Sequence, residues 1–226
     1  MNNQDKIICA LDFTDPEKAK KLVEELGDTI NFYKVGMLLQ FSGGLDIIKW
    51  LHKNNKKVFL DMKYYDIPET VASVVRKVAD TGVHFLTIHG NSKIIEQAVE
   101  ARGDSHLKLL AITVLTSMDS GDLEELGLKI PVQDMVSYRV AKAVEFGCDG
   151  IITSGHEVGG IKEKYGDKII AITPGIRPAG ESLHEHKRPV TPAEAIKSGA
   201  DYLVIGRPIY GAPNPRKAAE NIIKEI

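Results

Sequence analysis

Short apolar segments alternate with longer amphipathic segments along almost the whole of this 226-residue chain. The short segments are rich in β-branched residues, which is typical of buried strands, whereas the longer segments have helical spacing. We expect strands at residues 6–13, 31–37, 57–63, 85–90, 108–115, 150–155, 169–175 and 202–209. The helices expected between them include residues 16–26, 45–53, 68–80, 92–101, 133–146, 192–198 and 214–226.

This alternation implies right-handed crossovers and a parallel sheet. Eight such units in 226 residues predict a compact (β/α)8 TIM barrel that forms one domain over residues 1–226. The rival fold is a doubly wound open sheet, which normally has a glycine-rich first turn. Here the first strand ends without glycine, at Ala10-Leu11-Asp12-Phe13. The long connection at residues 175–190 is predicted to be a lid.

The charge balance narrows the range of partners. A net charge of −2 argues against a nucleic-acid or membrane-surface binder, but it allows a small phosphorylated ligand. Cys9 and Cys148 are unclustered, which predicts buried thiols in a reducing compartment. The chain starts without a signal-peptide pattern and has no apolar run of about 18 residues, so we expect a cytoplasmic protein.

Charged residues stand at the ends of the first three predicted strands. Asp12 closes the first, Lys34 lies in the second, and Asp61 and Lys63 close the third. Barrels of this kind form their active sites at the carboxyl ends of the strands. Because strand side chains alternate, Asp61 and Lys63 share one face, and the same parity applies to the two strands before them. We therefore predict a compact cluster of alternating charge, with Asp66 in the loop that follows.

The cluster favours one chemistry over two others. A Schiff-base lysine needs a lowered pKa, whereas the carboxylates beside Lys63 favour its ammonium form. A magnesium site on Asp12, Asp61 and Asp66 is an alternative, but the nearby lysines would occupy and repel the same space. An ammonium group directed at a developing carbanion fits better, because it stabilises the charge and then acts as the general acid. A purely structural ion-pair network is the remaining alternative.

A second signal lies at the ends of the last two strands. The eighth strand is followed by Gly206 and Arg207, and Arg177 follows the seventh. Glycine permits close backbone approach, and arginine supplies a charged fork for phosphate oxygens. Since barrels commonly bind phosphate after strands seven and eight, we predict a phosphate site there.

With these motifs the sequence resembles the orotidine 5′-phosphate decarboxylase family over essentially its whole length. The motifs that carry the resemblance are Ala10-Leu11-Asp12-Phe13, Tyr33-Lys34-Val35-Gly36, Asp61-Met62-Lys63-Tyr64-Tyr65-Asp66-Ile67-Pro68-Glu69-Thr70, Leu115-Thr116-Ser117, Thr173-Pro174-Gly175-Ile176-Arg177-Pro178 and Gly206-Arg207-Pro208-Ile209. The resemblance implies a barrel of the ribulose-phosphate-binding type. It also implies conversion of orotidine 5′-monophosphate to uridine 5′-monophosphate in de novo pyrimidine biosynthesis, without a metal or an organic cofactor.

The resemblance implies a role for each matching residue. Lys63 would protonate carbon 6 of the pyrimidine after carbon dioxide leaves, Asp61 would lie beside the substrate carboxylate, and Asp66 would complete the array with Lys34. The remaining substrate contacts would come from Asp12 and Lys34 to the ribose, Thr116 to the pyrimidine, and Arg177, Gly206 and Arg207 to the phosphate. In a homodimer, Asp66 and Thr70 would reach the neighbouring site, and Ile67 is a further binding candidate.

One departure from the family lies in the predicted lid, where His186 occupies the position of a glutamine that normally bridges phosphate and base. His186 is a candidate phosphate ligand. The rival function is a magnesium-dependent decarboxylase or aldolase of a keto-sugar phosphate in the same superfamily. Such relatives have a metal-binding glutamate where this chain has Lys34. A non-catalytic phosphate-binding barrel is a more remote alternative.

Overall fold

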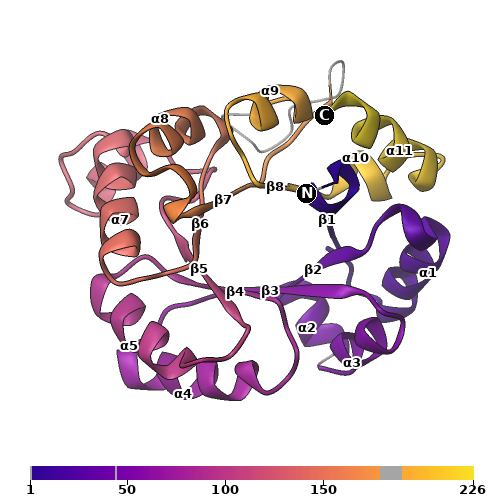
Figure 1. The fold of residues 1–226 in the computed structure, drawn as a ribbon, viewed down its shortest axis with the longest axis horizontal. Coiled ribbons are helices and arrows are strands. Elements are labelled where there is room, and N and C mark those ends of the chain that lie inside the picture. Colours follow the sequence, from indigo (N-terminus) through magenta and orange to yellow (C-terminus); the bar gives the residue numbers. More distant parts are fainter. Residues whose placement is uncertain (1, 44, 179–189) are drawn as a thin grey trace.

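The computed structural model describes residues 2–43, 45–178 and 190–226. Within these residues, eight parallel strands close into a barrel in the order β1-β2-β3-β4-β5-β6-β7-β8. Figure 1 looks into the barrel, with the strands as an inner ring and the helices around it. The predicted (β/α)8 TIM barrel is therefore confirmed.

The strands are β1 Ile7–Ala10, β2 Phe32–Gly36, β3 Lys57–Tyr64, β4 Phe85–His89, β5 Lys108–Ile112, β6 Gly150–Ile152, β7 Ile170–Thr173 and β8 Tyr202–Ile205. The predicted ends of β1, β5, β6, β7 and β8 are wrong by two to four residues. The apolar pattern runs on because residues beyond the ends, such as Leu11 and Val114, are also buried. Neither residue belongs to a strand, although the Leu11 N–H still donates to the Lys34 carbonyl of β2 at 2.9 Å.

The helices are α1 Pro16–Leu26, α2 Met37–Gly43, α3 Asp46–Lys53, α4 Pro68–Ala79, α5 Ser92–Arg102, α6 Ser120–Glu125, α7 Val132–Glu145, α8 Gly155–Tyr165, α9 Pro192–Lys197, α10 Arg207–Tyr210 and α11 Pro215–Glu225. Single-turn 3-10 helices lie at Asn3–Lys6, Gly27–Thr29 and Gly166–Lys168. The sequence pattern does not predict α2, α6, α8 or α10. Three of these have seven residues or fewer, and α8 contains three glycines, which weaken the helical signal.

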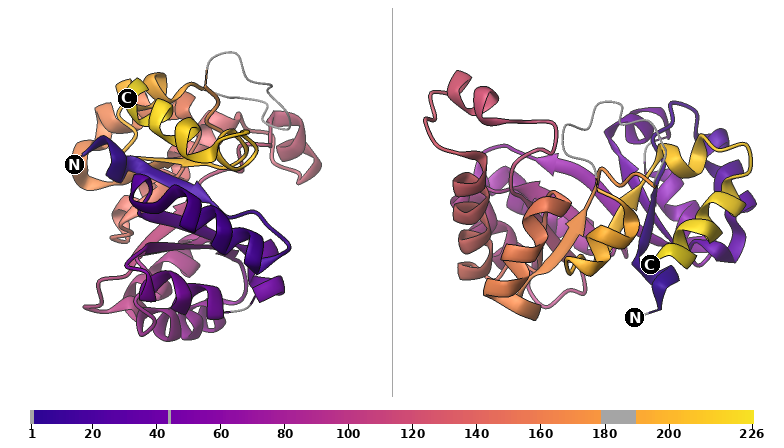
Figure 2. Two further views of the ribbon diagram at one scale, coloured as in Figure 1. Left: turned by 90° about the vertical axis from the view of Figure 1, so that its right-hand side faces the viewer. Right: turned by 90° about the horizontal axis from the view of Figure 1, so that it is seen from above.

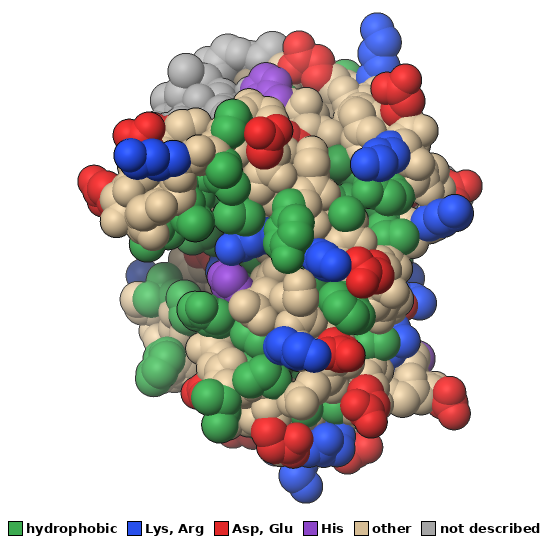
Figure 3. Space-filling model, turned by 90° about the vertical axis from the view of Figure 1, so that its left-hand side faces the viewer, with side chains coloured by type: hydrophobic (Ala, Val, Ile, Leu, Met, Phe, Trp, Pro, Cys, Tyr) green, Lys and Arg blue, Asp and Glu red, His purple; other side chains and the backbone are tan. Residues whose placement is uncertain are grey.

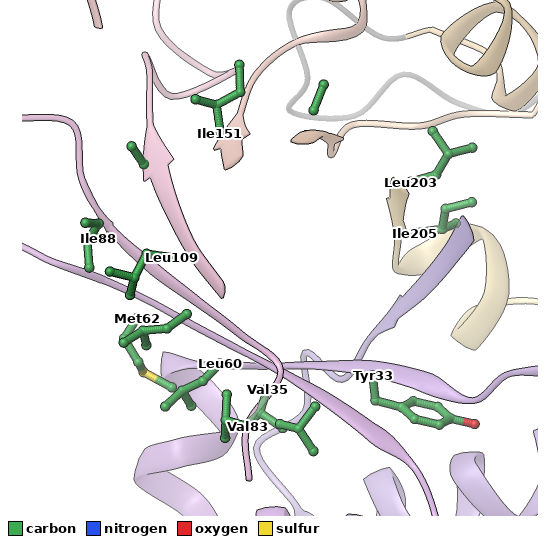
Figure 4. Close-up of a cluster of buried hydrophobic side chains, with 14 of the residues drawn as sticks. Tyr33, Val35, Leu60, Met62, Val83, Ile88, Leu109, Ile151, Leu203 and Ile205 are labelled. Atoms are coloured by element: carbon green, nitrogen blue, oxygen red, sulfur yellow. The ribbon is translucent and has the colours of Figure 1, made fainter. Parts of the chain in front are cut away.

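Apolar side chains form two separate layers. The inner layer fills the barrel and consists of Ile8, Ala10, Phe32, Phe59, Phe85, Leu110, Ile172 and Val204. The outer layer packs the strands against the helices, and Figure 4 shows part of it around Tyr33, Leu60 and Met62. Both cysteines are buried and unpaired, as predicted. None of the described helices is long and apolar enough to cross a membrane.

Polar contacts link neighbouring segments at the amino-terminal end of the barrel. Asp149, just before β6, accepts a hydrogen bond from the backbone of Leu109 at 3.0 Å. Asp201, just before β8, accepts one from the backbone of Ala171 at 2.7 Å. Lys56 donates to the carbonyl oxygens of Gly27 at 2.6 Å and Ile30 at 3.2 Å. These contacts stabilise the fold at the end of the barrel opposite the usual location of active sites.

The opposite end carries the connections that follow each strand. Figure 2 shows the segment containing α6 projecting from this end. The long connection after β7 has its two ends joined, because Ile176 and Val190 form a parallel bridge and the Arg177 N–H donates to the Val190 carbonyl at 2.9 Å. The residues of the predicted lid between them, 179–189, lie outside the described part of the chain.

Candidate active site

A pocket of about 310 Å³ opens at the carboxyl ends of the strands. Its polar side chains come from the strand ends and the loops after them: Asp12, Lys34, Asp61, Lys63, Thr116, Arg177, Arg207 and Tyr210. Its apolar wall consists mainly of Phe59, Ile112, Val114, Leu115, Ile152, Pro174 and Val204. The pocket therefore places charges beside an apolar surface, which suits a ligand with a flat ring and a charged tail.

Strand parity explains how the charges reach this pocket. Phe32 on β2 and Phe59 on β3 belong to the inner layer. Lys34 and Asp61 each lie two residues further along these strands, so they face the same interior one layer higher. In the strand register Lys34 pairs with Ala10 and Phe59, which brings the ends of β1, β2 and β3 together.

Four side chains form the predicted array of alternating charge. The Lys34 ammonium lies 3.0 Å from Oδ1 of Asp12 and 3.4 Å from Oδ2 of Asp61. The Lys63 ammonium lies 2.9 Å from Oδ1 of Asp61. The side chains of Lys34 and Asp61 are only 12% and 11% exposed, so each is shielded from water and relies on its partners. Lys63 is 36% exposed and reaches into the open pocket.

The array fixes the charges of its two buried members. Burial opposes the charge of Lys34, but Asp61 and Asp12 outweigh it and raise the lysine's pKa. Burial likewise opposes the charge of Asp61, but Lys34 and Lys63, with hydrogen bonds from Lys63 and Thr87, hold its pKa below the usual value. Near neutral pH the site therefore contains an ammonium and a carboxylate locked together beneath Lys63.

The backbone at Lys63 is unusual. Lys63 has φ of +52°, in the left-handed region that residues other than glycine seldom adopt. The register between β3 and β4 shifts between Leu60 and Tyr64, so Lys63 lies in a bulge. A bulge re-aims a side chain that would otherwise stay in the flat alternation of the strand. The backbone N–H of Lys63 donates to the hydroxyl of Thr87 at 2.9 Å.

The predicted phosphate residues lie in the same pocket, after the ends of β7 and β8. Arg177, Gly206 and Arg207 all line it. The prediction that the eighth strand continues to residue 209 is wrong, because Arg207 begins helix α10. A Cβ atom on Gly206 would lie 3.2 Å from the Tyr210 ring, which is a tight contact, and 3.6 Å from a carboxylate oxygen of Asp12. Glycine avoids this crowding and permits a ligand to approach the backbone closely.

The other predicted residues divide into two groups. Thr116 lines the pocket. Asp66, Ile67 and Thr70 are exposed, and none of them lines the pocket. The Asp66 carboxylate accepts from the backbone of Ile67 at 2.6 Å and forms no ion pair with Lys63 within the described residues. The expected flanking of Lys63 by Asp66 is thus not found within this single chain. His186 lies outside the described residues.

Sequence reasoning missed Thr87 and Tyr210. Thr87 is fully buried and donates to Oδ1 of Asp61 at 2.9 Å. Parity is the signal that could have found it, because Thr87 follows the inner-layer residue Phe85 by two positions. Tyr210 lines the pocket from α10, and burial, followed by the charge of Asp12, raises its pKa. Its position could not be predicted from the sequence, because the eighth strand was expected to continue to residue 209, where the structure has helix α10.

The donor set does not suit a divalent cation. The carboxylates of Asp12 and Asp61 are already paired with ammonium groups, which would repel a metal ion in the same space. Among the described residues, no group of three or more His, Cys, Asp or Glu side chains is arranged to hold a metal ion.

A closed parallel barrel with a charged pocket at the carboxyl ends of its strands defines the class of TIM-barrel enzymes. Residues 5–222 match the profile of the orotidine 5′-phosphate decarboxylase / HUMPS family, and the chain belongs to this family. It is a carboxy-lyase of that family, as its named relatives indicate.

Relatives resemble this chain over nearly its full length. The orotidine 5′-phosphate decarboxylase of Nitrobacter winogradskyi is 47% identical, over 99% of this chain and 93% of its own. That of Afipia carboxidovorans is 45% identical, over 100% and 96%. Among solved structures, orotidine 5′-phosphate decarboxylase from Lactobacillus acidophilus has a TM-score of 0.85 at 37% identity and covers 98% of both chains.

Proposed function

We propose that this enzyme converts orotidine 5′-monophosphate to uridine 5′-monophosphate and carbon dioxide in de novo pyrimidine biosynthesis, without a metal or a cofactor. The observation that carries the proposal is the array of Lys34, Asp61 and Lys63, which opens onto a pocket that Arg177 and Arg207 also line. Its named relatives provide further support.

Lys63 is the proposed catalytic group. The substrate carboxylate on carbon 6 lies beside Asp61, and the carbon–carbon bond breaks to release carbon dioxide. The electron pair stays on carbon 6, where the Lys63 ammonium stabilises it and then donates a proton to it. Lys63 regains that proton from solvent, so the reaction consumes one proton for each carbon dioxide released. Asp61, held ionised by two lysines, holds the Lys63 amino group in place at 2.9 Å.

The rest of the pocket is proposed to orient the substrate. Asp12 and Lys34 bind the ribose hydroxyls, and Thr116 binds the edge of the pyrimidine. Arg177, Arg207 and the backbone at Gly206 bind the 5′-phosphate, for which an arginine fork is well suited. The apolar wall takes the face of the ring. His186 stays a proposed phosphate ligand.

A homodimer is the proposed assembly. Asp66, Ile67 and Thr70 lie on the surface of the single chain, where they are free to complete a neighbouring site. Large exposed apolar side chains come mainly from segments that follow β2, β3 and β5: Met37, Leu38, Phe41, Leu45, Tyr65, Ile67, Leu115, Leu126, Leu128 and Ile130. Figure 3 shows apolar side chains exposed among charged ones over one face of the molecule. A surface of this kind favours association.

We also propose that residues 1–226 act as one domain in the cytoplasm. The barrel closes between β1 and β8, and Arg216 on α11 donates to the carbonyl of Glu25 on α1 at 2.8 Å, which joins the two ends of the chain. The unpaired thiols of Cys9 and Cys148 are compatible with a reducing compartment.

The main rival is a magnesium-dependent enzyme acting on a keto-sugar phosphate. Lys34 separates the two proposals, because it occupies the space between Asp12 and Asp61 where a cation would bind. A non-catalytic phosphate-binding barrel would keep the arginines but would not need Asp61 and Lys63 in contact.

The test is a direct assay. Purified protein treated with EDTA should bleach the ultraviolet absorbance of orotidine 5′-monophosphate at the same rate as untreated protein. A hexulose 6-phosphate offered with magnesium should not react. No bleaching at high enzyme concentration would refute the assignment, and bleaching that requires magnesium would favour the rival.

A further inference from the structure

Thr87 lies directly beneath the charged array. It sits on β4, and its side chain has no exposed surface. Its hydroxyl oxygen is 2.9 Å from the backbone nitrogen of Lys63 and 2.9 Å from Oδ1 of Asp61. A threonine hydroxyl has one proton to donate and lone pairs to accept. It therefore accepts from Lys63 and donates to Asp61 at the same time.

This hydroxyl acts on both ends of Lys63. At the backbone, it satisfies an N–H group in the bulge, where Lys63 has a left-handed conformation that is unfavourable for a residue with a side chain. At the side chain, it orients the same oxygen of Asp61 that accepts from the Lys63 ammonium at 2.9 Å. The Thr87 side chain thus fixes both the backbone of Lys63 and, through Asp61, the position of the Lys63 ammonium.

We propose that Thr87 is a positioning residue that directs the Lys63 ammonium towards the reacting carbon. This inference rests on the proposed function. Because it is fully buried, Thr87 does not reach the substrate and acts only through Lys63 and Asp61.

A buried threonine can also serve the fold alone, and Thr113 shows the difference. Thr113 follows β5, is equally buried, and donates to the carbonyl of Ile152 at 2.8 Å. Among the described residues, its hydroxyl forms no hydrogen bond to a member of the charged array. Thr113 therefore provides a matched control that loses a comparable buried hydrogen bond near the same end of the barrel.

The experiment compares wild type with Thr87→Val, Thr87→Ser and Thr113→Val. Valine keeps the shape of threonine and removes the hydroxyl, whereas serine keeps the hydroxyl. In Thr87→Val we expect kcat for orotidine 5′-monophosphate to fall roughly 10- to 100-fold, because small misplacement of a catalytic group has effects of this size. KM should change less than about 3-fold, since the phosphate contacts are untouched. Thr87→Ser should restore most of kcat.

The pH profile provides a second readout that a purely structural role would not move. Thr87 is one of the hydrogen-bond donors that hold down the pKa of Asp61. The acid limb of the kcat profile should therefore move to higher pH in Thr87→Val. In Thr87→Ser and Thr113→Val it should stay where it is in wild type.

Each result has a definite meaning. Wild type without turnover refutes the proposed function and the positioning role with it. Active wild type with unchanged kcat in Thr87→Val refutes only the role of Thr87, as does an equal loss in Thr113→Val. If Thr87→Val does not fold, Thr87→Cys replaces it, because a thiol is a weak donor and acceptor. Wild-type kcat in folded Thr87→Cys would also refute the inference.

Discussion

Lys63 combines a left-handed backbone conformation with a partly exposed charged side chain. Left-handed conformations cost a residue with a side chain about 1–2 kcal/mol, and such strain persists only where the surroundings hold it. Here Thr87 holds the N–H and Asp61 holds the ammonium. Neither the strain nor the bulge could be predicted from the sequence, because Leu60-Asp61-Met62-Lys63 is an ordinary alternating strand pattern. The proximity of Lys63 and Asp61 could be predicted, since the two residues lie two positions apart at the end of one strand.

Two substitutions of Lys63 separate the catalytic role of its side chain from the conformational strain of its backbone. Lys63→Ala and Lys63→Gly should both lower kcat by about 10⁴-fold or more, because each removes the proton donor and the positive charge. Binding of uridine 5′-monophosphate, measured by calorimetry, should persist in both. The glycine variant should be more stable to urea than the alanine variant by about 1 kcal/mol, since glycine adopts φ of +52° without strain.

Lys57→Ala is the matched control, because Lys57 lies at the other end of the same strand and is exposed. It should keep wild-type kcat. Equal stability of the two Lys63 variants would show that the left-handed backbone carries no cost, and residual turnover near wild type would remove Lys63 from the mechanism.

At the level of strands and helices, the alternation of inward-facing and outward-facing side chains predicted the site residues better than it predicted where the strands end. Inner-layer residues on β1, β2 and β3 are each followed two positions later by a residue of the charged array, so Asp12, Lys34 and Asp61 could be placed from the sequence. The start of α10 could not, because Arg207-Pro208-Ile209-Tyr210 is apolar enough to continue the preceding strand. Only the backbone turn at Gly206 reveals the change.

Helix α10 carries Arg207 to the pocket, which leads to a test of phosphate binding. Arg207→Ala should lower kcat/KM for orotidine 5′-monophosphate by roughly 10- to 100-fold, the effect expected from losing a charged hydrogen bond. Turnover of orotidine, which lacks the phosphate, should not change. Arg216→Ala on the outer helix α11 removes the same charge and should have no effect on either substrate. Equal losses with both substrates would mean that Arg207 does not bind phosphate.

For the molecule as a whole, the carboxyl end of the barrel carries the pocket and the amino-terminal end carries structural contacts. Only the first of these could be predicted from the sequence. The carboxyl end was predictable because its charges interrupt apolar strands. The amino-terminal end was not, because Lys56, Asp149 and Asp201 look like ordinary surface charges in the sequence. That end also holds packed imidazole rings: His84 lies 6.4 Å from His52 between ring centres.

His84 should make stability depend on pH. Burial, then Lys57 and the neighbouring histidines, lowers its pKa from 6.5 to about 4. The folded state thus favours neutral His84, so its contribution is complete above about pH 6.5 and is lost as pH falls towards 4. Between pH 7 and 4.5, wild type should lose more free energy of unfolding than His84→Phe, because only wild type has this imidazole to protonate. The expected difference is only about 1 kcal/mol, because His84 is partly exposed and solvent screens the effect.

The same change at exposed His156 is the control and should keep the wild-type loss. Urea unfolding at the two pH values measures all three proteins. A loss in His84→Phe equal to that of wild type would assign the acid sensitivity to other groups.

The bridge between Ile176 and Val190 has a consequence for how this enzyme can diverge. Arg177 is held by its own hydrogen bond to Val190, next to the point where the two ends of the connection meet. Its position is thereby uncoupled from the number of residues in between. Insertions there increase the entropic cost of closing the loop only slowly, by about 0.6 kcal/mol for each doubling of its length. Lineages can therefore lengthen, shorten or rewrite this stretch while Arg177 stays in register with the barrel.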